Sequence, residues 1–238
     1  MENYYGWRAR IGVIAPIDDK VEYAFNKYAP EGVSFDSTRL WFPGPTPEGL
    51  VFLSDQLEEA AKMYRKSPHD VILFGCTSGS CIKGYGFDKE CIERIERASG
   101  CPGLTTSTAV LEAFEALGLT KTVVMTPYPE DTNQAEKKFL EDNGIEVTSI
   151  TGIGFNKVGE FGHPSKRHLY RNAMKLDTTG AEVFFLSCMG LATMELIPAL
   201  EDDLGMPVIT SHQASLWACL RHSGVNDKLP NLGKLFTI

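Results

Sequence analysis

The chain has 238 residues, of which 43% are hydrophobic and 23% charged, and its formal net charge is −8. This length is enough for one large α/β domain or for two lobes of about 100 to 150 residues each. The acidic balance, without a Lys/Arg cluster, argues against a nucleic-acid partner. No apolar run approaches the roughly 20 residues that cross a bilayer, and residues 1–7 lack the features of a signal peptide. We therefore expect a cytoplasmic protein without a membrane partner.

In the first half of the chain, apolar runs that end at turn formers alternate with amphipathic segments, which indicates strands followed by helices. We expect strands over 10–15, 33–41 and 71–76 and helices over 20–28, 50–66, 88–99 and 107–117. The loop 42–49 is rich in proline and glycine and can help to cover a site. The glycines that follow Cys76 predict a mobile or closely packed turn.

The second half repeats this alternation. We expect strands over 122–126, 146–150, 183–187 and 208–211, helices over 131–143, 164–175, 194–204 and 214–222, and a glycine-rich loop over 151–162. Proline, cysteine and Thr/Ser recur in the same order in both halves, and corresponding positions such as Cys76 and Cys188 lie about 110 residues apart. The spacing predicts a duplicated α/β unit.

Two segments, 71–79 and 183–190, each place a cysteine at the C-terminal end of an apolar strand, just before small or hydroxyl residues. Ligands of open α/β sheets bind beyond the carboxyl ends of such strands, so Cys76 and Cys188 should face one crevice. The other four cysteines are most simply small buried hydrophobes: Cys81, Cys91, Cys101 and Cys219. No C-x-x-C pair and no zinc-type spacing occurs, so we expect free thiols and no metal.

A thiol near a helix N-terminus or hydrogen-bond donors can have a lowered pKa, and both cysteines precede residues that could start helices. One thiolate can then attack or deprotonate a substrate while the opposite thiol delivers a proton, without a cofactor. The alternative is two buried structural thiols.

The predicted substrate-binding residues lie at the ends of the two cysteine-bearing strands or of the first strand of each half. The predicted set is Pro16, Thr77, Ser78, Tyr128, Met189 and Gly190. The hydroxyls of Thr77, Ser78 and Tyr128 and the backbone N–H groups of Met189 and Gly190 can bind a carboxylate that gains charge as a proton leaves. Helix capping alone is the alternative for Thr77 and Ser78, and a packed ring with a solvated hydroxyl is the alternative for Tyr128.

Nearly the whole chain resembles the aspartate/glutamate racemase superfamily, in the branch of maleate cis-trans isomerases and arylmalonate decarboxylases. The matching motifs are Thr46-Pro-Glu-Gly49, Gly75-Cys76-Thr77-Ser78, Ser107-Thr-Ala-Val110, Tyr128 with Asp131 and Asn133, Ser187-Cys188, Met206-Pro-Val-Ile-Thr-Ser211 and Leu232-Gly-Lys-Leu-Phe236. The resemblance implies two pseudosymmetric Rossmann-like lobes with the active site in the cleft between them. We place the lobes at 1–117 and 118–238, with the C-terminal helix able to return to the first lobe.

In the isomerases of this branch, the resemblance implies that Cys76 adds to the double bond of maleate and that Cys188 handles the proton. In the decarboxylases the first position is glycine, the residue matching Cys188 protonates an enediolate, and Thr77, Ser78 and Tyr128 hold the dianion. The isomerases and racemases carry an Asn in a Pro-Ser-Ser-Asn-like stretch where this chain has Pro16-Ile17-Asp18-Asp19, and an acid there repels a carboxylate unless it is protonated or turned away. The residues after Cys188 resemble those of the decarboxylases instead.

We therefore predict a cofactor-independent isomerase or racemase of a small carboxylic acid, with maleate as the first substrate to try. The alternatives are an arylmalonate decarboxylase-like enzyme with Cys188 as proton donor and an amino-acid or hydantoin racemase. Asp18 and Asp19 also leave open a binding protein that has lost catalysis. A thiol-redox enzyme is a further alternative, and oxidation could join Cys76 to Cys188. We expect a homo-oligomer.

Overall fold

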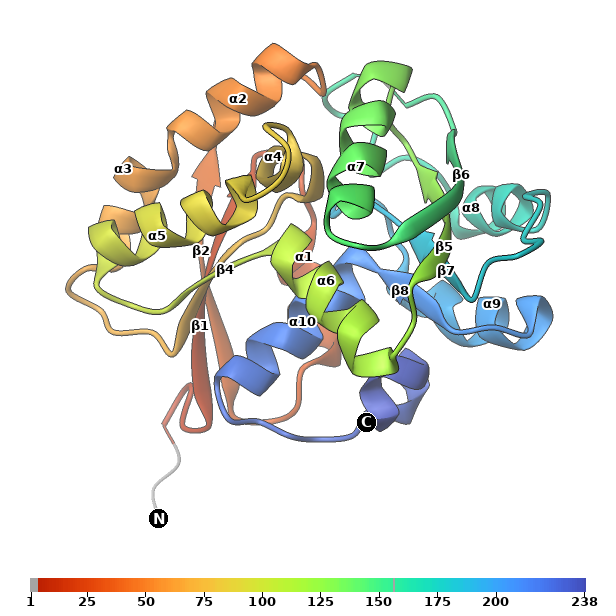
Figure 1. The fold of residues 1–238 in the computed structure, drawn as a ribbon. Helices are drawn as coiled ribbons and strands as arrows, with labels where there is room; N and C mark the ends of the chain where they lie inside the picture. The colour runs from red at the N-terminus through yellow and green to blue at the C-terminus, as the bar shows by residue number, and fades with distance from the viewer. Residues whose placement is uncertain (1–3, 156) are drawn as a thin grey trace.

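The computed structural model describes residues 4–155 and 157–238, which form two sheets of four parallel strands each (Figure 1). The strand order is β2-β1-β3-β4 in one sheet and β6-β5-β7-β8 in the other. The two sheets have the same strand order, as expected for the duplicated α/β unit that the spacing predicts. The two-lobed α/β architecture is confirmed. Parallel sheets of this kind are covered on both faces by helices, and their inner strands are buried throughout.

The first sheet and its helices come from the first half of the chain. In chain order the elements are β1 (Ala9–Pro16), α1 (Val21–Tyr28), β2 (Val33–Leu40), α2 (Pro47–Asp55), α3 (Leu57–Ala61), η1 (Lys62–Tyr64), β3 (Val71–Phe74), α4 (Thr77–Cys81), α5 (Phe87–Ser99), β4 (Gly103–Thr105) and α6 (Thr106–Leu117). All four residues of β3 are fully buried, because α5 packs on one side of it and α10 (Ser211–His222) on the other.

The second sheet is built in the same way from the second half. Its elements are β5 (Lys121–Thr126), α7 (Glu130–Asp142), β6 (Glu146–Gly152), α8 (Lys166–Ala173), β7 (Val183–Leu186), η2 (Met194–Leu196), α9 (Ile197–Leu204), β8 (Val208–Thr210), α10, η3 (Pro230–Leu232) and η4 (Lys234–Thr237). Helix α10 begins earlier than the sequence predicts, because Thr210 and Gln213 form a reciprocal capping box at its N-terminus.

Two segments differ in kind from the prediction. The expected helix over 50–66 is broken at Gln56, whose side chain bonds the backbone N–H and carbonyl of Trp41. It also begins earlier, because Thr46 caps α2 through the N–H of Gly49 and Pro47 occupies the first turn. After Cys76 the short helix α4 comes first, and the turn that the glycines predict follows it at residues 82–86.

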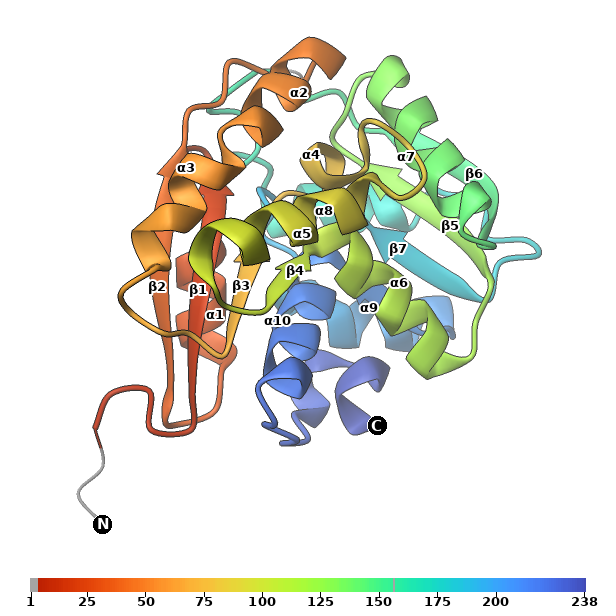
Figure 2. The same ribbon diagram turned by 60° about the vertical axis from the view of Figure 1, so that its left-hand side comes forward.

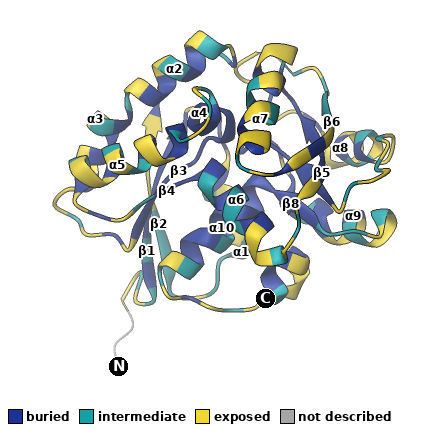
Figure 3. Cartoon of the chain, viewed as in Figure 1, coloured by how far each residue is buried: buried dark blue, intermediate teal, exposed yellow. Residues whose placement is uncertain are grey.

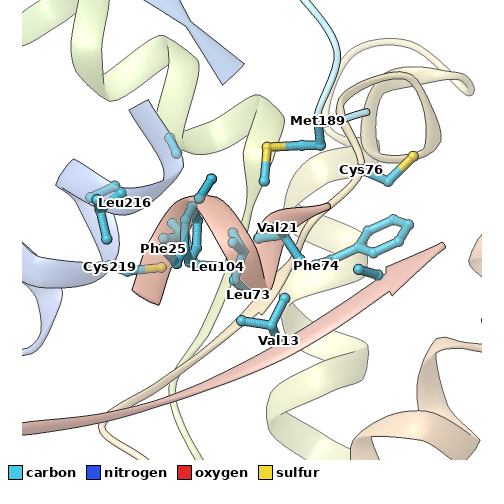
Figure 4. Close-up of a cluster of buried hydrophobic side chains, with 14 of the residues drawn as sticks. Val13, Val21, Phe25, Leu73, Phe74, Cys76, Leu104, Met189, Leu216 and Cys219 are labelled. Carbon is cyan, nitrogen blue, oxygen red and sulfur yellow. The ribbon is translucent and has the colours of Figure 1, made fainter. Parts of the chain in front are cut away.

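Helices α6 and α10 lie side by side between the two sheets (Figures 1 and 2). Helix α10 contacts α1 and β3 as well as β8, so it touches elements of both sheets. Buried residues follow the strands and inner helix faces, and exposed residues follow the outer faces (Figure 3). Cys76 and Met189, which follow strands of different sheets, belong to one apolar cluster (Figure 4). The boundary at residue 117 stays a prediction.

Candidate active site

A cavity lies beyond the carboxyl ends of β1, β3, β5 and β7, the two central strands of each sheet. Thirteen described residues line it: Pro16, Asp18, Asp19, Phe42, Pro45, Cys76, Thr77, Ser78, Tyr128, Phe161, Cys188, Met189 and Gly190. All eight residues that the sequence predicts for the site are in this set. The space between these residues is about 370 Å³, part of it open to solvent.

Cys76 follows β3 and is the N-cap residue of α4, where its Sγ accepts the Gly79 N–H at 3.3 Å. A Cβ on Gly79 would lie 2.9 Å from this sulfur, so the close approach requires glycine. Burial raises the pKa of the Cys76 thiol to about 12, and the Gly79 N–H offsets only part of that rise. The expected lowering of this pKa is therefore wrong, because desolvation outweighs the effect of a helix of five residues.

Cys188 follows β7 in a different backbone conformation. Its φ is 109°, and within 4–155 and 157–238 it is the one non-glycine residue with a positive φ. The Sγ accepts the Gly190 N–H at 3.2 Å. No helix starts here, contrary to the prediction: a turn at 189–190 leads to η2 and α9. Burial again raises the thiol pKa, and the Tyr128 hydroxyl and the Gly190 N–H lower it in part.

One hydrogen-bond chain joins the two cysteine loops. Thr77 Oγ1 donates to Ser211 Oγ at 2.8 Å, and the same oxygen accepts the Cys188 backbone N–H at 2.9 Å. Because Cys76 Sγ itself caps α4, the capping alternative for Thr77 and Ser78 is wrong. The two hydroxyl residues are 3% and 2% exposed, so each lies at the cavity and not in bulk solvent.

Tyr128 follows β5 in the second half of the chain and lines the same cavity as Cys76. Its backbone N–H donates to Thr126 Oγ1 at 3.1 Å, and its ring packs edge-on against Phe161 at 6.4 Å between centroids. Burial raises the pKa of the Tyr128 hydroxyl well above its usual value, so the phenol is neutral and able to donate.

Five lining residues are absent from the predicted site: Asp18, Asp19, Phe42, Pro45 and Phe161. The signal for three of them was present in the sequence, because Phe42 and Pro45 belong to the turn-rich loop 42–49 and Phe161 to the glycine-rich loop 151–162. The two aspartates stand out only as departures from the isomerase pattern.

Asp18 and Asp19 have different environments. Asp18 Oδ2 accepts the Gly159 N–H at 2.6 Å, which ties the loop that carries Phe161 to the first lobe. Asp19 Oδ1 accepts the Lys20 N–H at 2.6 Å and lies 3.9 Å from His212 Nε2. Burial is the main cause that raises the pKa of the Asp19 carboxyl well above its usual value. An acid at this place avoids repelling a carboxylate if it is protonated or turned away, and the raised pKa of Asp19 favours the protonated form.

The four other cysteines are buried and lie outside the lining set, and all six cysteines are free. Over the described ranges, no group of three or more His, Cys, Asp or Glu side chains is arranged to hold a metal ion. No helix among these residues is long and apolar enough to cross a membrane.

Sequence comparison identifies relatives with two activities in their names. An arylmalonate decarboxylase from Bordetella bronchiseptica is 29% identical over 205 residues, which is 85% of each chain. A maleate isomerase from Geobacillus stearothermophilus is 21% identical over 243 residues, which is 96% of this chain and 97% of the relative.

Structure comparison gives the same two names. A liganded double mutant of arylmalonate decarboxylase, with glycine changed to cysteine and cysteine to serine, has a TM-score of 0.90 at 28% identity, covering 96% of this chain and 98% of the other. A maleate isomerase from Pseudomonas putida S16 with maleate has a TM-score of 0.90 at 21% identity, covering 96% and 97%, and shows the shared fold. The arylmalonate decarboxylase family model matches residues 11–236. The predicted resemblance to this branch is confirmed, and the chain belongs to the arylmalonate decarboxylase family.

Proposed function

We propose that this protein is a cofactor-independent isomerase of a small carboxylic acid, similar to maleate cis-trans isomerase, with Cys76 as nucleophile and Cys188 as proton donor. The observation that carries the proposal is that both thiols line one small cavity together with hydroxyl groups. Relatives named maleate isomerase support it, and a structure of one from Nocardia farcinica, a cysteine-to-serine mutant, contains a covalently bound succinylcysteine intermediate.

The proposed reaction needs one thiolate and one thiol. The Cys76 thiolate adds to one alkene carbon of maleate, and the displaced electron pair takes the Cys188 thiol proton at the other carbon. The carbon–carbon bond is now single and can rotate. Cys188, now a thiolate, removes a proton from that carbon, the carbon–sulfur bond to Cys76 breaks, and fumarate leaves with both sulfurs in their starting states.

The hydrogen-bond donors around the sulfurs suit these steps. The Gly79 N–H at 3.3 Å from Cys76 Sγ and the Gly190 N–H at 3.2 Å from Cys188 Sγ stabilise the respective thiolates. The hydroxyls of Ser78 and Tyr128 are placed to bind a carboxylate that gains negative charge as the sulfur adds. Cys188 is kept protonated by its raised pKa, which suits a group that must deliver a proton first.

A second candidate is decarboxylation of a substituted malonate. It is favoured by the family match and by the apolar part of the cavity, where Phe42, Pro45, Phe161 and Met189 could pack against an aryl group. In that reaction the carbon–carbon bond to one carboxylate breaks, carbon dioxide leaves, and the enediolate takes its proton from Cys188. Cys76 is then not required for turnover.

Proton NMR in heavy water distinguishes these reactions with maleate, phenylmalonate, aspartate, glutamate and a hydantoin as substrates. We expect fumarate from maleate, with a loss of at least about 100-fold in rate for both Cys76→Ser and Cys188→Ala. Cys101→Ala, which changes a buried cysteine outside the cavity, is the matched control and should retain activity.

Retention of most activity in either active-site variant would remove that cysteine from the mechanism. Carbon dioxide release that survives Cys76→Ser would favour the decarboxylase, and α-proton exchange of an amino acid or hydantoin would favour a racemase. Carboxylate binding without turnover, unchanged in both variants, would indicate a binding protein.

The proposal places the enzyme in the cytoplasm as a homo-oligomer. Six free cysteines are consistent with a reducing compartment. Sedimentation velocity of the purified chain measures the oligomeric state.

A further inference from the structure

Resting on the proposed function, we infer that Asp19 binds a carboxylate of the substrate as a neutral carboxylic acid, which donates its own proton in the hydrogen bond. This assigns a specificity-determining role to a residue that is an acid in a site for an anion. The consequence is that the site accepts a dicarboxylate without any cation to pair with it.

The charges around the cavity give the first reason. None of its thirteen described lining residues is Lys, Arg or His. The two nearest cations are engaged elsewhere: Lys20 Nζ donates to the Asp18 carbonyl at 3.4 Å, and Arg39 donates to the Pro16 carbonyl at 2.6 Å and pairs with Glu22. An ionised Asp19 would therefore repel a dianion without compensation, since desolvated like charges interact strongly.

The two oxygens of Asp19 give the second reason. Oδ1 accepts the Lys20 backbone N–H, whereas Oδ2 forms no hydrogen bond within the described chain and is not among its fully buried unpartnered atoms. A proton on the carboxyl therefore belongs on Oδ2, the oxygen that a ligand can reach. The side chain is 5% exposed, so solvent competes weakly for this donor.

His212 gives the third reason. In the described chain its Nε2 is the one Lys, Arg or His side-chain nitrogen within 4.0 Å of an Asp19 carboxyl oxygen. Neither of its ring nitrogens has a hydrogen-bond partner there, and its ring packs edge-on against Phe25 at 6.4 Å. Burial lowers the pKa of His212 to about 4, so the imidazole is neutral near pH 7. It supplies no positive charge that would hold Asp19 in its ionised form.

Asp19 could instead take the thiol proton of a cysteine, but the contacts do not support that role. Each cysteine sulfur accepts a backbone N–H, and neither forms a hydrogen bond with Asp19 in the described ranges. A ligand between Asp19 and the sulfurs would contact all three groups, because all three line the same cavity. Asp19 therefore acts on the substrate and not on the thiols.

The donor role makes ligand affinity fall as the pH rises. Once Asp19 ionises, dicarboxylate binding must take up a proton, so affinity drops about tenfold per pH unit. The ionisable groups that face Asp19 are Lys20 and Glu22 at the start of α1, Arg39 on β2, His212 on α10, its neighbour Asp18, and the cavity thiols Cys76 and Cys188. Asp19→Asn keeps a hydrogen-bond donor that cannot ionise. Comparing this variant with the wild type therefore separates the effect of Asp19 on the pH dependence from that of the other groups.

Two measurements test the inference independently of turnover. Infrared difference spectra, wild type against Asp19→Asn, should show the carbonyl band of a protonated carboxyl in the ligand-free protein at pH 7. Calorimetry with succinate, which has no double bond to react, measures affinity and proton uptake from pH 6 to 9. Asp18→Asn makes the same charge change one residue away and serves as the matched control; thermal unfolding checks the fold of every variant.

We expect Asp19→Asn to bind succinate within about threefold of wild type at pH 7 and to lose the decline at high pH, which wild type and Asp18→Asn keep. Asp19→Ala should bind at least about tenfold more weakly. Absence of the infrared band, an equal pH dependence in Asp19→Asn and wild type, or binding that tightens more than tenfold in Asp19→Asn at pH 7 would each overturn the inference. If the wild type does not convert maleate while these binding results hold, the proposed function is overturned and the inference about Asp19 is not.

Discussion

Glu136 offers a direct test of how burial controls charge behind the active site. It lies on α7, is 2% exposed, and lines a small cavity with Thr77 and Phe185. Neither of its carboxyl oxygens has a hydrogen-bond partner in the described ranges, and neither has the nearby Ser187 Oγ. Burial raises the pKa of Glu136 from 4.5 to about 7.

This raised pKa makes the free energy of unfolding depend on pH. The folded state holds the proton more tightly than the unfolded chain, so the stabilisation is fully present below pH 4.5 and is lost as the pH rises to about 7. A rise of this size corresponds to about 3 kcal/mol. We expect Glu136→Gln to lack this loss, because its amide does not ionise.

Urea denaturation of the wild type and Glu136→Gln at several pH values between 4 and 8 measures the effect. The difference between their unfolding free energies should change by about 3 kcal/mol in favour of the variant, while its absolute value includes the cost of burying an amide. Glu141→Gln changes an exposed carboxyl on the same helix and should follow the wild type. Parallel curves for the wild type and Glu136→Gln would refute the reasoning.

Three further predictions concern the cavity. Because burial raises the pKa of Cys76 to about 12, kcat for maleate should rise about tenfold per pH unit from pH 6 to 9, and a flat profile would show that the thiolate is already formed. A Cβ on Gly190 would lie 2.6 Å from Phe161 Cβ, so Gly190→Ala should raise KM about tenfold and destabilise the fold by about 1–3 kcal/mol. Gly162→Ala meets only the end of a lysine side chain at 3.5 Å and is the control; equal effects would contradict the steric explanation. Thr77→Val removes the 2.8 Å hydrogen bond between the cysteine loops and should lower the free energy of unfolding by about 1 kcal/mol, measured in urea; an unchanged value would show that this bond contributes nothing.

The strands, the duplication and the predicted pair of thiols could be read from the sequence. Apolar runs as short as Val71–Phe74 and Val183–Leu186 are too short for a helix, and because they end at small residues and recur at equal spacing they indicate buried strands. Parallel strands then place Cys76 and Cys188 at the same edge of their sheets. This is local information, and the sequence by itself determined it.

The state of the site was decided by tertiary structure. A pKa depends on burial and on neighbours from distant segments, as Asp19 and His212 show: they meet at 3.9 Å although 193 positions separate them. The positive φ of Cys188 and the closure of the cavity by Phe161 likewise depend on packing between the two halves. Sequence patterns report the periodicity of one segment, whereas charge, strain and closure arise only where several segments exclude water together.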